Sequence, residues 1–137
     1  MTEFIWPVRV YYEDTDSGGV VYYANYLKFM ERARTEWLRS LGFEQDQLLM
    51  RDNILFAVRS ISLDYHKPAH FNDRLLVSAR LSARGHASLC FEQAVTREGR
   101  ETEILCAGKV RIACLAADTL RPRPLPTPML TELPDVH

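Results

Sequence analysis

Residues 24–41, with the sequence ANYLKFMERARTEWLRSL, decide the fold. Apolar side chains in this stretch recur at steps of three and four residues, which places them on one face of a helix. They are Tyr26, Phe29, Met30, Ala33, Trp37, Leu38 and Leu41. Gly42 follows directly and is placed to end the helix in a left-handed C-cap. A helix with so large an aromatic and aliphatic face needs a broad partner, and a sheet is the obvious one.

Five segments predict the strands of that sheet: 5–12, 54–65, 74–84, 87–97 and 102–115. In the first strand, alternation puts Trp6, Val8, Val10 and Tyr12 on one side. In 54–65 the parity of the apolar residues shifts, which suggests a bulge near Arg59-Ser60. Short turns around Gly85-His86 and Gly99 favour an antiparallel meander. The order of elements indicates an α+β domain in which one antiparallel sheet of about five strands wraps one long helix.

Two further segments complete the expected chain. Residues 44–52 predict a short helical or irregular connection. The tail from Thr119 holds five of the seven prolines, so we expect an extended surface segment with one helical turn around Met129–Leu133. With 137 residues in all, we expect residues 1–137 to form a single domain.

Composition excludes several classes of function. Lys and Arg number 17 against 18 Asp and Glu, so the chain lacks the basic surface of a nucleic-acid-binding protein. No run approaches the roughly 20 apolar residues that cross a bilayer, and the N-terminus does not resemble a signal peptide. Cys90, Cys106 and Cys114 are odd in number and fall within predicted strands, which indicates buried free thiols in a reducing cytoplasm rather than a zinc site or a catalytic thiol.

An acidic, glycine-rich loop precedes the predicted helix in residues 11–26, YYEDTDSGGVVYYANY. Its Asp-x-Asp start and sixth-position glycine are found in calcium-binding EF-hand loops. Calcium is disfavoured, however, because Gly18 at the fifth position has no side-chain ligand and Asn25 replaces the glutamate at the twelfth. A plain turn or helix cap is the simplest alternative. Against it stands the density of carboxylates, since Glu13, Asp14 and Asp16 cannot all be caps.

The third interpretation is a site for acyl chemistry. Gly18 and Gly19 allow the backbone to approach a ligand closely. Free N–H groups near Tyr22, Tyr23 and Ala24, at the positive end of the helix dipole, can hold a developing oxyanion. A carboxylate on the other side of the same carbonyl can attack it or activate water.

The motif Tyr12-x-Asp14-Thr15-Asp16-x-x-Gly19-Val20-Val21-Tyr22-x-x-Asn25-Tyr26 resembles the acyl-CoA thioesterases of the hotdog fold. In particular it is similar to the 4-hydroxybenzoyl-CoA thioesterase-like branch associated with the Tol–Pal system. The helix segment 31–38 and the order of the later strands extend the resemblance over most of the chain. The resemblance implies hydrolysis of an acyl-CoA, with Asp16 as the catalytic carboxylate and the Tyr23 backbone N–H polarising the thioester carbonyl.

The resemblance also implies substrate-binding residues. Gly19 belongs to the glycine pair that lets the backbone approach the ligand. Glu31 matches a position near the acyl group, although an ion pair with Arg34 is an equal alternative. Phe56 is placed to line the acyl pocket or to be a plain core aromatic. Arg84 and Ser88 occupy a region that approaches the CoA nucleotide in relatives, although Arg84 is otherwise an ordinary turn charge.

Further expectations follow from the same resemblance. It implies a homodimer assembling to a tetramer, a site at the subunit interface, no metal or organic cofactor, and a peripheral link to phospholipid metabolism or the cell envelope. Tol–Pal-type members commonly carry His where this chain has Tyr23, which puts any proton transfer by a histidine there in question. Two rivals are an acyl-thioester dehydratase, which needs a His beside Asp16, and a non-enzymatic acyl-CoA-binding or envelope-complex scaffold.

Overall fold

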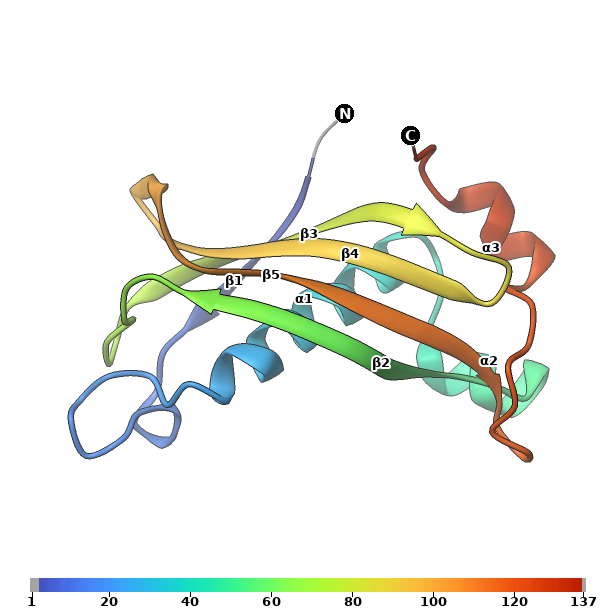
Figure 1. Cartoon of the computed structure of the whole chain (residues 1–137), viewed down its shortest axis with the longest axis horizontal. Helices are drawn as coiled ribbons and strands as arrows, with labels where there is room; N and C mark the ends of the chain where they lie inside the picture. Colours follow the sequence, from blue (N-terminus) through green and yellow to red (C-terminus); the bar gives the residue numbers. More distant parts are fainter. Residues whose placement is uncertain (1–2, 137) are drawn as a thin grey trace.

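The computed structural model describes residues 3–136. Its elements are β1 (Phe4–Arg9), the 3-10 turn η1 (Tyr12–Asp14), α1 (Asn25–Ser40), α2 (Gln45–Asp52), β2 (Ile54–Tyr65), β3 (Arg74–Arg84), β4 (Ser88–Arg97), β5 (Arg100–Ala116) and α3 (Thr127–Glu132). The strands form an antiparallel sheet in the order β1-β3-β4-β5-β2, and α1 lies along one face of it (Figure 1). The predicted α+β architecture, with five strands around one long helix, is confirmed.

The helix α1 is held by the apolar face that the sequence predicted. Phe29, Met30 and Ala33 are completely buried against the sheet. Each large side chain buried in this way contributes roughly 1.5–3 kcal/mol, so the helix is stabilised mainly by packing. Gly42 has the left-handed φ of 96° that was predicted, and its N–H donates to the carbonyl oxygen of Arg39 at 2.9 Å.

The β2–β5 ladder contains the predicted bulge. Its register shifts between Val58 and Ser60, so Arg59 is the extra residue. Further along the same ladder, Gly108 pairs with Leu63, and a Cβ built on Gly108 would lie 2.2 Å from the carbonyl oxygen of Ser62. Only glycine fits at that position without a shift of the backbone.

The first strand is shorter than expected. It ends at Arg9, and Tyr12 is 75% exposed, so the prediction that Tyr12 shares the buried side with Val8 and Val10 is wrong for Tyr12. The reason is local: the Asp14 carboxylate accepts a hydrogen bond from the Tyr11 N–H at 2.9 Å, and this contact curls residues 12–14 into η1. The chain therefore leaves the sheet before Tyr12.

The strand order corrects the expected meander. Consecutive pairing holds for β3, β4 and β5, but β2 lies beside β5 rather than β3 and forms one edge of the sheet. Segment 66–73 connects this edge strand to β3 across the end of the sheet (Figure 1). The opposite edge strand, β1, contains Pro7, whose missing N–H is tolerated at an edge.

The tail contains the predicted helical turn as α3 but is not simply a surface segment. Leu125, Met129 and Leu133 are buried, and the Leu125 N–H donates to the carbonyl oxygen of His86 at 3.0 Å. Alternation of prolines with apolar residues conceals this anchoring in the sequence. Among the described helices, none is long and apolar enough to cross a membrane.

The cysteines lie in strands, as predicted, and are free thiols. Cys106 and Cys114 are completely buried, whereas Cys90 is half-buried. Burial raises the pKa of the Cys106 thiol to about 12, so this group stays protonated at neutral pH. A buried, protonated thiol is a packing group rather than a nucleophile.

Candidate active site

The acidic loop, residues 13–23, projects beyond the end of the sheet at the start of α1 (Figure 1). Asp14 is buried within it and serves structure: besides capping Tyr11 through its carboxylate, its carbonyl oxygen accepts hydrogen bonds from the Tyr22 N–H and the Asn25 Nδ2, both at 2.9 Å. Asp14 therefore holds the base of the loop closed.

Asp16 lies at the exposed tip of the loop. Its Oδ1 accepts a hydrogen bond from the Gly18 N–H at 2.8 Å, and the Gly19 N–H donates to its carbonyl oxygen at 3.0 Å. Gly19 has a φ of 78°, a conformation that favours glycine. The turn thus fixes the direction of the Asp16 carboxylate, while no hydrogen bond within residues 3–136 engages its Oδ2. An oriented carboxylate with one free oxygen can act as a nucleophile or general base.

The backbone at Tyr23 supplies a free donor close to the helix start. α1 begins at Asn25 with Ala24 as its N-cap, and the N–H groups of Tyr23 and Ala24 have no acceptor within residues 3–136. The expectation of a free N–H at Tyr22 is wrong, because Asp14 accepts it. A free N–H beside the N-terminus of a helix can stabilise an oxyanion.

Sequence reasoning missed Tyr65. Its hydroxyl donates to the Tyr23 carbonyl oxygen at 3.0 Å and so fixes the peptide that follows Tyr23. A hollow of about 270 Å³ lies against this contact, and burial raises the pKa of Tyr65 and of Tyr26 in its wall. The hollow is lined by Val21, Tyr23, Tyr26, Tyr65, His66, Lys67 and Pro68. No local signal reveals this role, because Tyr65 lies 42 residues from Tyr23 in the chain.

Glu31 and Phe56 come together at a second place. They line a cavity of about 100 Å³ between α1 and the sheet. The alternative ion pair between Glu31 and Arg34 is not formed. Arg34 is a buried residue of α1, and its Nη1 instead donates to Gln93 Oε1 at 3.0 Å. Burial lowers the pKa of Arg34, and the charge of Glu31 partly offsets this effect.

Most of the cavity wall is apolar. Its lining residues are Glu31, Arg34, Thr35, Trp37, Leu38, Gln45, Phe56, Val58, Leu89, Phe91 and Ile112. They come from the middle and C-terminal half of α1, from α2, and from β2, β4 and β5. This region, together with Arg84 and Ser88, is called the cavity end below. The loop end comprises residues 13–23 and 65–73.

Arg84 and Ser88 lie far from Asp16 within one chain. β3 runs from Arg74, next to the loop end, to Arg84, which is roughly 33 Å of extended strand. Arg84 Nη1 donates to the carbonyl oxygen of Leu130 at 3.4 Å, which ties it loosely to α3. Within a single chain, Asp16, Gly19 and Tyr23 therefore belong to the loop at one end, Glu31 and Phe56 share a cavity, and Arg84 and Ser88 lie at the far end of the sheet.

Comparison with known proteins now identifies the family. A model described as the thioesterase superfamily matches residues 18–104. The chain belongs to the thioesterase superfamily. The fold is the hotdog thioesterase fold that the loop and helix motif predicted.

Named relatives of this superfamily cover nearly the whole chain. The acyl-CoA thioester hydrolase YbgC of Escherichia coli is 42% identical over 131 residues, which are 96% of each protein. The acyl-CoA thioesterase YbgC of Haemophilus influenzae is 45% identical over 123 residues, covering 90% of this chain and 88% of that protein.

Solved structures of thioesterases share the architecture. A probable thioesterase from Bartonella henselae has a TM-score of 0.84 at 34% identity, over 91% of this chain and 100% of that one. A 1,4-dihydroxy-2-naphthoyl-CoA thioesterase from Synechocystis has a TM-score of 0.86 at 26% identity, over 96% and 95%.

Proposed function

We propose that this protein hydrolyses acyl-CoA thioesters to a free acid and CoA, with Asp16 as the catalytic carboxylate and the Tyr23 N–H as the oxyanion donor. The observation that supports this most directly is the joint geometry of the loop. An oriented carboxylate with a free oxygen and a free helix-start N–H lie seven residues apart, in a chain 42% identical to an acyl-CoA thioester hydrolase.

Two routes use the same groups. In the first, the Asp16 carboxylate attacks the thioester carbonyl carbon, the oxyanion forms at the Tyr23 N–H, and the C–S bond breaks to release CoA thiolate. Water then hydrolyses the mixed anhydride, which regenerates the carboxylate. In the second, Asp16 takes a proton from water as that water attacks. Neither route needs a metal or organic cofactor.

The separation of the two ends supports a site shared between two copies of the chain. Asp16 is exposed in one chain, and an exposed carboxylate is fully hydrated and poorly placed for catalysis. β2 has a free edge and exposes Val58 and Ile61 at 52% and 39%. Two-fold pairing of β2 edges runs antiparallel, so the loop end of one chain meets the cavity end of its partner. We place the acyl group in that partner cavity, beside Glu31 and Phe56.

In this arrangement Gly19 lets the backbone approach the thioester, and the partner's cavity end brings Arg84 and Ser88 towards the nucleotide of CoA. Arginine suits that role because its guanidinium binds phosphate oxygens in pairs. Pairing of two such dimers gives the tetramer. The mass of the protein in solution, measured by sedimentation-velocity ultracentrifugation, distinguishes a tetramer from a dimer.

The test of the proposed function is free-thiol release from a panel of short, long and aromatic acyl-CoAs. We expect the wild type to hydrolyse at least one class and Asp16→Asn to lose that turnover. Glu13→Gln is the matched control, because Glu13 is an exposed carboxylate of the same loop with no hydrogen bond through its side chain in the described structure. If the wild type binds acyl-CoA but releases no thiol, the acyl-CoA-binding scaffold replaces the enzyme.

The dehydratase alternative needs a histidine beside Asp16, and the geometry disfavours it. His70 is the histidine that pairs with the loop, through a backbone bridge to Val20, but its Nδ1 lies 3.9 Å from Asp73. The carboxylate beside His70 is therefore Asp73 of its own segment, not Asp16 of the acidic loop.

The resemblance to the Tol–Pal-associated branch supports a cytoplasmic enzyme that serves phospholipid metabolism or the cell envelope. The buried free thiols Cys106 and Cys114 are compatible with a reducing compartment. Cell fractionation tests the location, and affinity purification from envelope extracts tests the link: recovery only with unrelated soluble proteins would remove it.

A further inference from the structure

The catalytic loop depends on a neighbouring segment for its position. Apart from bonds to Tyr11, Tyr12 and the start of α1, the hydrogen bonds of the loop to the rest of the described chain end on residues 65–70. The Val21 N–H donates to the Ala69 carbonyl oxygen at 2.8 Å, which pairs Val20 with His70, and the Tyr65 hydroxyl donates to the Tyr23 carbonyl oxygen. Tyr12, at the base of the loop, stacks on Phe71 with 3.8 Å between ring centroids. Any shift of that segment therefore moves the loop.

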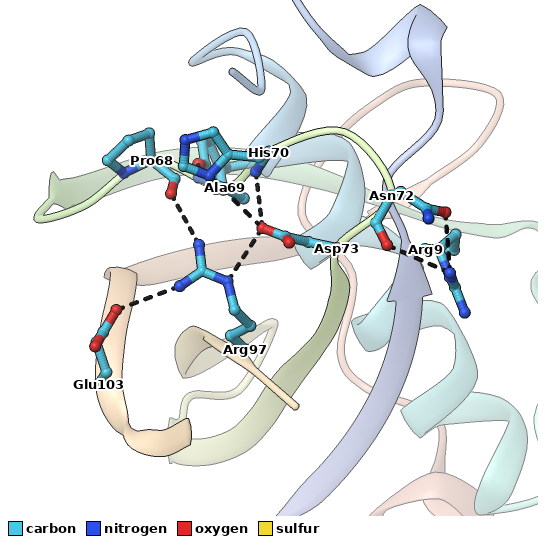
Figure 2. Close-up of polar contacts among 9 residues, drawn as sticks. Arg9, Pro68, Ala69, His70, Asn72, Asp73, Arg97 and Glu103 are labelled. Atoms are coloured by element: carbon cyan, nitrogen blue, oxygen red, sulfur yellow. Dashed lines mark hydrogen bonds and ion pairs between the residues drawn. The ribbon is translucent and has the colours of Figure 1, made fainter. Parts of the chain in front are cut away.

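Segment 66–73 is itself irregular. Its backbone bonds to Leu105 and Val10, and the Ala69 N–H donates to the Tyr26 hydroxyl at 3.0 Å. One side chain from β4 adds contacts at two points of the segment. Figure 2 shows the Arg97 guanidinium facing this segment, with one contact to each end of it. Arg97 Nη2 donates to the Pro68 carbonyl oxygen at 3.1 Å, and Nε donates to Asp73 Oδ2 at 3.1 Å. Nη1 donates to Glu103 Oε1 of β5 at 3.3 Å, which anchors the guanidinium to the sheet.

The contact with Asp73 continues towards the loop. Asp73 Oδ2 also accepts a hydrogen bond from the His70 N–H at 2.8 Å, and His70 is the residue that bridges to Val20. Residues 68–73 are thus clamped at both ends around Ala69 and His70, the two that hold the loop. The Arg97 side chain is only 19% exposed, and its bonds to Asp73 and Glu103 are partly buried, whereas its bond to Pro68 is exposed.

We propose that Arg97 is a positioning residue for the Asp16 loop: it fixes segment 66–73, and through it the loop, without touching the substrate. This inference rests on the proposed function. The guanidinium bonds its three acceptors from three separate nitrogens held in one plane, whereas a lysine ammonium presents its three donors from a single nitrogen and spans less distance. Displacements of about 1 Å at reacting groups lower rates by up to about 10²-fold, so loss of the clamp should reduce turnover.

The experiment compares Arg97→Met with Arg74→Met. Arg74 is the matched control because it also forms an ion pair, to Glu98 at 2.7 Å, but both partners are about half exposed and, in the described structure, neither side chain hydrogen-bonds to segment 66–73. We expect Arg97→Met to lower kcat about tenfold or more with KM changed less than about threefold. Amide hydrogen exchange in residues 13–23 should accelerate while exchange in α1 stays the same. Arg74→Met should change neither readout.

Arg97→Lys is the second variant, which serves if Arg97→Met does not fold. Lysine keeps the positive charge but lacks the planar guanidinium. The values of kcat and of loop amide exchange should therefore lie between those of the wild type and those of Arg97→Met. The proposal is overturned if the folded Arg97 variants keep wild-type kcat and loop exchange, or if Arg74→Met matches Arg97→Met. If the wild type hydrolyses no acyl-CoA, the proposed function fails, and accelerated loop exchange in the Arg97 variants still tests the clamp separately.

Discussion

The loop end and the cavity end of the sheet are built in opposite ways. At the loop end, Asp16 is exposed and its position depends on backbone hydrogen bonds between two irregular segments. At the cavity end, regular elements meet, and the buried Arg34 is held by Gln93, whose Nε2 in turn donates to the Met30 carbonyl oxygen at 3.0 Å. The proposed reactive groups lie at the irregular end, and the shaped apolar space lies where regular elements meet.

The difference suggests a division of labour. A rigid, packed cavity suits recognition of an acyl group, because its walls do not have to move. An exposed loop suits a nucleophile that becomes enclosed only when a second surface arrives. One chain holds the loop and Arg84 at opposite ends of β3, an extended strand of roughly 33 Å, so the comparison predicts that two chains are needed for one complete site.

The largest expected effect is on activity, when the loop end is altered in one chain and the cavity end in another. Asp16→Asn should lower kcat about 10²–10⁴-fold, and Arg84→Glu should raise KM by repelling phosphate. When the two variants are unfolded and refolded together, half of the dimers are mixed and each mixed dimer has one unaltered site. The mixture should then recover roughly a quarter of the wild-type kcat/KM, measured by thiol release. A mixture no more active than the sum of its components would break the comparison.

The next effect tests the β2–β5 seam near the loop end. Gly108→Ala should lower the free energy of unfolding by about 3 kcal/mol, because the new Cβ would meet the Ser62 carbonyl oxygen at 2.2 Å. Gly85→Ala is the control: its Cβ would meet only the Ser88 hydroxyl, which can rotate away, so the loss should stay under about 1 kcal/mol. Urea unfolding measures both, and equal losses would contradict the argument.

The cavity end is probed through its buried polar contact. Gln93→Leu removes the acceptor of Arg34 Nη1 and should cost about 1–3 kcal/mol in urea unfolding. Adding Arg34→Met should restore part of that loss, since no buried charge then remains unpaired. A double variant whose loss equals the sum of the two single losses would show that the two side chains act separately.

The smallest effect is a pH dependence at the loop end, where Cys106 pairs with Tyr65. The folded pKa of about 12 lies above the unfolded value near 8.5, so the folded state retains the proton while the unfolded state releases it. Stability from this group is complete below pH 8.5 and falls as pH rises towards 12. Between pH 9 and pH 10.5 we expect a loss of about 1–2 kcal/mol, reduced in Cys106→Ala. Equal slopes for both proteins would exclude Cys106 as the cause.

Periodicity predicted the regular elements well because each depends on its own residues. The helix came within one residue at each end, and Gly42 and the bulge at Arg59 were found from local pattern. The errors arose where distant groups compete. Tyr12 leaves the sheet because Asp14 caps Tyr11, and the tail is anchored by contacts that proline alternation hides.

The candidate site divides in the same way. Asp16 and Tyr23 were predictable because the motif is contiguous. Tyr65 and Arg97 were not. Tyr65 reaches Tyr23 from 42 residues away, and Arg97 acts through Pro68 and Asp73, 29 and 24 residues from it, by contacts that exist only once the sheet has formed. The loss of the Tyr22 N–H to Asp14 is also a tertiary effect, in which the loop folds back on itself.

The two edges of the sheet differ in a way that bears on aggregation. Pro7 in the middle of β1 withholds a donor, so this edge is a poor template for an incoming strand. Among the described residues, the β2 edge carries no proline. If two chains pair through β2, each partner then presents only its β1 edge, where Pro7 lowers the tendency of a further strand to add.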